Sequence, residues 1–183
     1  MTSGDSTTSR DAVIGVAIPV PEPWGEYLRQ LRVDYGDTRA RHIPTHITLL
    51  PPTTTTSAAL DGVRAHLSEV AARHTPFEAI LRGTGTFRPV SDVVYVQVAQ
   101  GVASCEQLER DVRSGPLERE LSFPYHPHVT LAHDLPQRVL DQVFADLTGF
   151  SCTFQVEAFR LYGHRGDELW SPLQDFPMGA AER

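Results

Sequence analysis

The sequence has few of the features that mark exported, membrane-bound or disulfide-stabilised proteins. Only two cysteines, Cys105 and Cys152, occur in 183 residues, and without an export signal we expect both to be free thiols. No apolar run approaches the roughly 20 residues that a membrane-spanning helix needs. The polar first residues lack the apolar stretch of a signal peptide. We therefore expect a cytoplasmic protein with no membrane partner.

Positive charge is also scarce. The 16 arginines are outnumbered by 23 acidic residues, which gives a net charge of -7. This balance argues against a protein that coats nucleic acid by bulk electrostatics. It leaves room for an enzyme that binds one RNA terminus or one small nucleotide in a locally basic cleft. We expect such a protein to work as a monomer.

The chain reads as two halves with the same order of elements: strand, helix, strand, helix, strand. The expected strands cover 12–20, 43–50 and 77–81 in the first half, and 93–98, 126–132 and 152–159 in the second. The second strand is expected to stop at Pro51 and Pro52, before a polar loop at 53–56. Ser104 and Gln107 form a candidate capping box for a helix.

These elements predict an α+β fold, built as a bilobal pseudo-twofold duplication. Each lobe is expected to be a largely antiparallel sheet with helices packed outside, and we expect a central cleft between the lobes. Residues 1–11 are expected to be disordered, 12–171 to form the single bilobal domain, with a hairpin over 160–170, and 172–183 to form a loose tail.

One short motif occurs in both halves at matching positions. His46-Ile47-Thr48-Leu49 and His128-Val129-Thr130-Leu131 each read His, apolar, Thr, Leu. Because side chains alternate along a strand, the His and Thr of each motif share one face and the apolar residues share the other. If the halves pack about a pseudo-twofold axis, both His-Thr pairs meet in one cleft.

Two imidazoles and two hydroxyls are sufficient for phosphodiester chemistry. Histidine titrates near neutrality, so two of them can act as base and acid. Hydroxyl donors beside them can stabilise the charge on the non-bridging oxygens in the transition state. One His-x-Thr copy would mean little on its own, but two copies at matching points of a repeated pattern predict catalytic roles for His46, Thr48, His128 and Thr130.

The histidines also allow a metal-binding alternative. His126 and His128 are spaced to lie on one face of a strand and could chelate a metal ion. Neither motif offers a close third ligand, since threonine binds zinc poorly. We therefore expect no metal and no cofactor.

The sequence resembles the 2H phosphoesterase superfamily, especially its bacterial branch named for 2'-5' RNA ligase and RNA cyclic phosphodiesterase. The resemblance rests on HITLLPP (46–52) and YHPHVTLA (125–132), is supported by GTGTFRP (83–89), and spans residues 12–170. It implies a bilobal α+β fold with both motifs in the cleft. Relatives often carry an arginine just after the second motif, where this chain has His133.

The resemblance implies an enzyme that opens 2',3'-cyclic phosphates of RNA ends or nucleotides, with His128 as the base and His46 as the acid. Alternatives are a 2'-5' RNA ligase or phosphodiesterase, a phosphodiesterase for an ADP-ribose cyclic phosphate, and a non-catalytic nucleotide- or RNA-binding module. Candidate substrate-binding residues are Phe87, Arg88, Tyr125 and His133.

Overall fold

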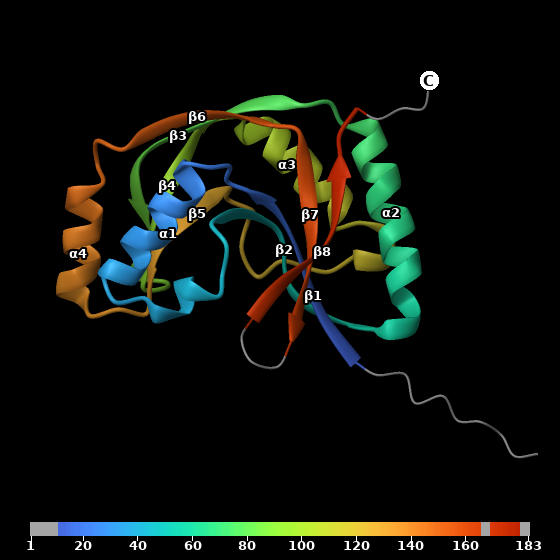
Figure 1. Ribbon diagram of the computed structural model, residues 1–183, viewed down its shortest axis with the longest axis horizontal. Coiled ribbons are helices and arrows are strands. Elements are labelled where there is room, and N and C mark those ends of the chain that lie inside the picture. Colours follow the sequence, from blue (N-terminus) through green and yellow to red (C-terminus); the bar gives the residue numbers. More distant parts are fainter. Residues whose placement is uncertain (1–10, 166–168, 180–183) are drawn as a thin grey trace, which may run out of the picture.

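The computed structural model of the protein describes residues 11–165 and 169–179. This part of the chain contains eight strands, which are β1 (Asp11–Pro19), β2 (His46–Thr56), β3 (Phe77–Thr86), β4 (Val93–Gln100), β5 (His128–His133), β6 (Ser151–Val156), β7 (Ala158–Arg165) and β8 (Leu169–Pro177). The helices are α1 (Trp24–Asp34), α2 (Leu60–Arg73), α3 (Val102–Val112) and α4 (Gln137–Asp146). Helices α4 and α2 lie at opposite ends of the long axis (Figure 1).

The eight strands form one antiparallel sheet in the order β6-β3-β4-β5-β2-β1-β7-β8. The expected α+β class and antiparallel pairing are confirmed. The expectation of a separate sheet in each half is wrong, because all eight strands share one sheet and β3, assigned to the first half, lies between β6 and β4 of the second. At the centre of the sheet, β2 and β5 carry the two His-x-Thr motifs and pair through Ile47 and Val129. The site therefore lies where the two halves of the sheet meet.

The β2 strand is longer than the sequence predicted. We expected it to end at Pro51-Pro52, but it runs through both prolines to Thr56, which pairs with Asp11 of β1. A proline is tolerated in a strand where its missing N–H is not needed by a neighbour. Over this stretch β2 pairs with β1 alone among the described strands, and the pairing shifts register between Ile14 and Val16.

The C-terminal segment is a further correction. Residues 172–177 were expected in a loose tail, but they complete β8, which pairs with β7 along its whole length. Phe176 is 2% exposed and its ring stacks on Phe159 at 5.3 Å between centroids. Burial of this aromatic ring outweighs the local turn signals of Pro172 and Pro177.

Two other local predictions were wrong. Helix α3 begins at Val102, after Gly101 with a φ of 93°, and no side chain caps it, so the Ser104–Gln107 capping box does not form. The single strand expected at 152–159 is two strands, β6 and β7, separated at Glu157.

Cys105 and Cys152 are both buried free thiols, as expected. Among the described residues, no helix is long and apolar enough to cross a membrane.

The packing of β8 gives a stability prediction. Phe176→Ala should lower the free energy of unfolding by about 3–5 kcal/mol, because it removes a buried aromatic ring from a closed core. The matched control is Phe123→Ala, the same change at a side chain that is 66% exposed, where a change within about 0.5 kcal/mol is expected. Denaturant unfolding measures both. Equal values for the two variants would mean that β8 adds nothing to the core.

Candidate active site

The two motifs lie at the centre of the sheet, and their side chains alternate between the cleft and the core as predicted. His46 and Thr48 are half-buried, whereas Ile47 and Leu49 are almost completely buried, and the second motif repeats this pattern. Ile47 pairs with Val129 in antiparallel register. One residue either side of that pair, His46 therefore lies across from Thr130, and Thr48 across from His128. Each imidazole has the hydroxyl of the other motif as its cross-strand neighbour.

A β-bulge follows each motif. The β1–β2 pairing passes from Ala17↔Thr48 to Val16↔Leu50, and the β4–β5 pairing passes from Tyr95↔Thr130 to Val94↔Ala132. Each bulge adds one residue to the motif strand, so two consecutive side chains are buried in place of one.

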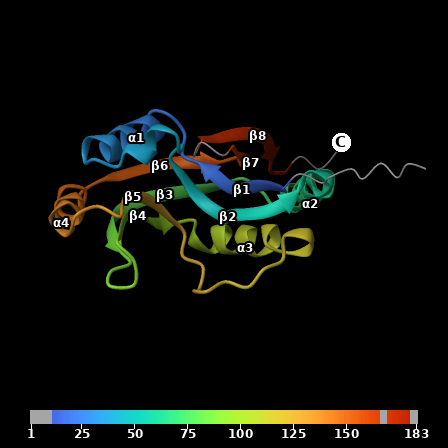
Figure 2. The same cartoon turned by 90° about the horizontal axis from the view of Figure 1, so that it is seen from below.

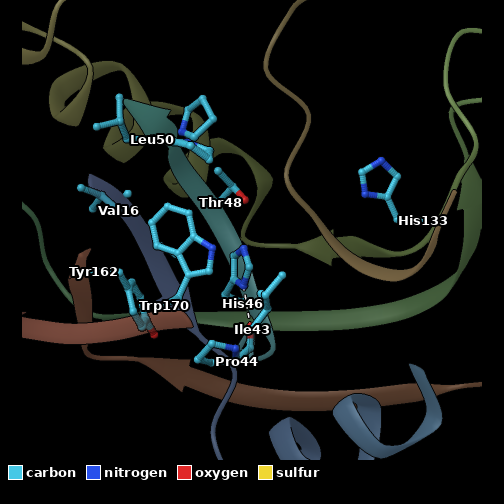
Figure 3. Close-up of a pocket in the computed structure, with 13 residues that line it drawn as sticks. Val16, Ile43, Pro44, His46, Thr48, Leu50, His133, Tyr162 and Trp170 are labelled. Carbon is cyan, nitrogen blue, oxygen red and sulfur yellow. Dashed lines mark hydrogen bonds between the residues drawn. The ribbon is translucent and has the colours of Figure 1, made fainter. Parts of the chain in front are cut away.

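The second bulge brings His133 to the cleft. Strict alternation points its side chain away from the face of His128 and Thr130, but the extra residue restores it to that face. His133 lines the same pocket as His46 and Thr48, and Figure 3 shows it on the far side of the opening. The Arg39 guanidinium donates to the His133 carbonyl at 2.9 Å, which ties the end of β5 to the first half of the chain.

Both catalytic candidates are held by the same kind of hydrogen bond. His46 donates its Nδ1–H to the Pro44 carbonyl at 2.6 Å, and His128 donates its Nδ1–H to the His126 carbonyl at 2.7 Å. Because a carbonyl oxygen only accepts, each neutral ring carries its proton on Nδ1 and keeps an Nε2 lone pair. Both imidazoles are thus fixed in the tautomer that a base at Nε2 requires.

Both rings favour the neutral form. Burial lowers the pKa of His46, and the positive charge of Arg32 lowers it further, while the Pro44 hydrogen bond opposes them. Burial also lowers the pKa of His128 to about 4, with contributions from the neighbouring His126 and His46 and with the His126 carbonyl hydrogen bond opposing. Near neutral pH both rings of the free protein are therefore neutral, and a negative charge in the cleft would favour their protonation.

Aromatic side chains surround His128. Phe87, a candidate substrate-binding residue, meets the His128 ring edge-on at 4.9 Å and packs on Tyr95 at 4.5 Å between centroids. Tyr95 is also 5.2 Å from the His128 ring. Figure 2 shows the β3–β4 connection, which carries Phe87, and the segment that leads into β5 on the same side of the molecule. Phe87 is thus placed to orient His128.

Two other candidates make defined contacts. Tyr125 donates its hydroxyl to the Thr48 carbonyl at 2.9 Å and so ties the segment before β5 to β2. Arg88 reaches α4 instead of the pocket, with Nη1 2.8 Å from Asp141 Oδ1 and 3.0 Å from Gln137 Oε1. Its charge is therefore directed at α4.

The pocket beside the first motif has a volume of about 300 Å³. Besides His46, Thr48 and His133, it is lined by Gly15, Val16, Ala17, Ile43, Pro44, Leu50, Pro51, Pro52, Tyr162 and Trp170. Trp170 and His46 are both part of this lining (Figure 3). Sequence reasoning missed Gly15, Tyr162 and Trp170, because nothing local shows that the β7–β8 hairpin packs beside β1.

The metal-binding alternative requires converging ligands. Among the residues that the structure describes, no group of three or more His, Cys, Asp or Glu side chains is placed to hold a metal ion. The His126 and His128 rings lie stacked with 6.3 Å between their centroids, and His128 Nδ1 already donates to a carbonyl. The pair therefore gains no third ligand in this part of the chain.

The two imidazoles give a prediction for the free protein. In an NMR titration, the His128 ring should stay neutral until the pH falls to about 4, and His46 should titrate below 6.5. In the urea-unfolded chain both should titrate near 6.5, the value of an exposed histidine, to about 0.5 unit. A His128 ring that is already protonated at pH 6.5 in the folded protein would contradict the burial argument.

Comparison with known proteins agrees with this geometry. A family model described as the 2'-5' RNA ligase superfamily matches residues 19–168. The chain is 26% identical to a presumed phosphoesterase of Oceanobacillus iheyensis over 167 residues, which is 90% of this chain and 97% of the relative.

Solved structures of Escherichia coli LigT share the fold. The complex with NADP+ superposes with a TM-score of 0.66 at 21% identity, covering 93% of this chain and 99% of LigT. The complex with 3'-AMP gives a TM-score of 0.63 at 23% identity, covering 92% and 99%. With a family model over most of its length and a His-x-Thr motif on each central strand, the chain belongs to the 2'-5' RNA ligase superfamily and is a 2H phosphoesterase.

Proposed function

We propose that the protein is a metal-independent phosphodiesterase that opens 2',3'-cyclic phosphates of RNA ends or nucleotides. The observation that carries this proposal is the pair of imidazoles on β2 and β5, each with Nδ1 committed to a carbonyl and each across from a threonine of the other strand. This arrangement supplies a base, an acid and two neutral donors in one cleft.

The proposed reaction adds one water across a phosphorus–oxygen bond. His128 Nε2 takes a proton from water as its oxygen attacks phosphorus. The bond from phosphorus to one ribose oxygen breaks, and protonated His46 gives its Nε2 proton to that oxygen. Thr48 and Thr130 donate hydrogen bonds to the non-bridging oxygens, where negative charge grows in the transition state. The product is a nucleoside with one phosphate monoester.

The substrate itself supplies the charge that the acid needs. In the free protein both histidine pKa values are lowered, chiefly by burial. A cyclic phosphate is an anion, and an anion close to an imidazole favours its protonated form. Binding therefore raises the pKa of the histidine that receives the proton, and the acid is completed when the substrate arrives.

The known relatives support a nucleotide-like substrate. Crystal structures of LigT contain 3'-AMP, NADP+ or ATP, all of which are adenosine phosphates. A non-catalytic binding module would bind such molecules without converting them. A 2'-5' ligase or phosphodiesterase would act on 2'-5'-linked nucleotides, and an ADP-ribose cyclic phosphate would be a third substrate class. Assays with all three substrates separate these alternatives.

Each motif histidine should be essential. His46→Ala and His128→Ala are each expected to lower the rate of opening of 2',3'-cyclic AMP by about 10²–10⁴-fold, because each removes a proton-transfer group. His74→Gln serves as the control, since His74 pairs with Asp111 at 2.8 Å and lies outside the pocket.

The assay reads product formation by mass spectrometry and is repeated after exhaustive chelation, which should leave the wild-type rate unchanged. A folded His46→Ala or His128→Ala protein with near-normal turnover would refute the two-histidine mechanism. Loss of wild-type activity that only an added metal ion restores would refute its metal independence.

The pH profile of kcat/KM should be bell-shaped and displaced to acid pH. This parameter reports the free enzyme. As the pH rises through about 4, His128 becomes available as the base. As it rises further, His46 loses the proton that the acid needs at a pKa below 6.5. The kcat profile should lie at higher pH, because bound phosphate raises these pKa values. An alkaline limb of kcat/KM above 6.5 would contradict the assignment of His46.

A further inference from the structure

The pocket extends away from the reaction centre on one side only. Of the catalytic candidates it includes His46 and Thr48, and it continues over β1, β7 and β8 to Trp170. The proposed acid, base and hydroxyl donors account for the chemistry at phosphorus. The walls around Trp170 take no part in that chemistry, although they form most of the lining.

Trp170 lies against β1 because position 15 has no side chain. A Cβ built on Gly15 would stand 3.1 Å from Cζ3 and 3.4 Å from Cη2 of the indole. The His164 ring supports Trp170 from β7 at 5.0 Å between centroids. The indole itself is half-buried. It is therefore held in place while part of its ring system remains open to the pocket.

The remaining walls are apolar and rigid. Pro44, Pro51 and Ile43 line the pocket beside Trp170, and the buried Tyr162 ring closes it on the β7 side. The nearby cation, Arg160, is paired with Asp175 and lies over the Tyr162 ring at 5.9 Å from its centroid. Such walls favour a flat, uncharged ring over an anion, because aromatic rings stack on indole and proline surfaces with little desolvation cost.

We propose that this pocket is the nucleobase subsite of the enzyme, in which the base attached to the cyclic phosphate stacks on Trp170. The inference rests on the proposed function and names its substrate class: the reacting nucleotide must carry a base. A volume of about 300 Å³ is at the small end of ligand pockets, which span roughly 300–1,000 Å³. The subsite therefore takes the terminal base alone.

The test compares two cyclic phosphates that differ in the base. Adenosine 2',3'-cyclic phosphate carries one, whereas glycerol 1,2-cyclic phosphate has the same five-membered ring without it. The wild-type protein should show a higher kcat/KM for the adenosine substrate. Trp170→Ala should lower that value by about 5- to 100-fold, the usual effect of removing one stacking platform, and should lower the value for the glycerol substrate by a much smaller factor.

Two further variants separate stacking from a general loss of structure. Trp170→Phe keeps a flat ring and should retain most of the preference for the adenosine substrate. Gly15→Ala leaves Trp170 intact but places a methyl group against its ring, and should lower the preference by displacing the indole. An equal loss on both substrates in Trp170→Ala would assign Trp170 a structural role and overturn the proposal.

A binding measurement makes the test independent of turnover. The chain has two tryptophans, and Trp24 packs edge-on against Phe150 at 6.0 Å, away from the pocket. In Trp24→Phe, the fluorescence therefore reports on Trp170 alone. Adenosine 3'-phosphate should quench it, and inorganic phosphate should not. In Trp170→Phe, adenosine 3'-phosphate should leave the Trp24 signal unchanged.

The outcomes distinguish the two proposals. If both cyclic phosphates are opened with equal kcat/KM, the phosphodiesterase function holds and the base subsite is wrong. If neither is opened but adenosine 3'-phosphate quenches Trp170, the subsite holds and the proposed reaction is wrong. Quenching by inorganic phosphate alone would overturn the subsite whatever the activity.

Discussion

The pairing of Ile47 with Val129 joins the two halves of the sheet and sets the geometry of everything in the cleft. Because β2 and β5 are antiparallel, this one register places each histidine across from the threonine of the other motif. A shift of this pairing by one residue would turn the imidazole of one motif into the core and the apolar side chains of that motif into the cleft. The chemistry that the cleft can perform therefore depends on the register between β2 and β5.

Few backbone contacts join β2 to β5, so side chains complete the connection between the halves. The Tyr125 hydroxyl binds the Thr48 carbonyl, and Arg39 binds the carbonyl of His133. At the periphery, the Tyr35 hydroxyl donates to Asp146 at 2.7 Å and links α1 to α4. That carboxylate raises the pKa of Tyr35 to about 12, so the phenol remains a donor at neutral pH. Each tie holds a segment that carries a site residue or abuts one.

The sequence was sufficient to predict the motif face and insufficient to predict what surrounds it. Alternation and the repeat identify His46 and His128, since an apolar residue next to each must face the core. The bulge that returns His133 to the cleft depends on a register shift against β4, which leaves no local mark. Trp170 lies in β8, which pairs with β7. It joins the site only because β7 in turn pairs with β1, more than 140 residues earlier in the chain. The fold class follows from element order, whereas these neighbours follow from long-range pairing.

The paired bulges make corresponding positions of two strands chemically unequal. Beyond each bulge, the next side chain faces the cleft again. This side chain is Pro51 in β2 and His133 in β5. One side of the opening is therefore apolar and backed by an indole, and the other bears an ionisable ring held near Asp134. The two sides of the cleft therefore differ in polarity, so the nucleotide proposed as substrate is expected to enter with its base toward the indole and its phosphate toward His133.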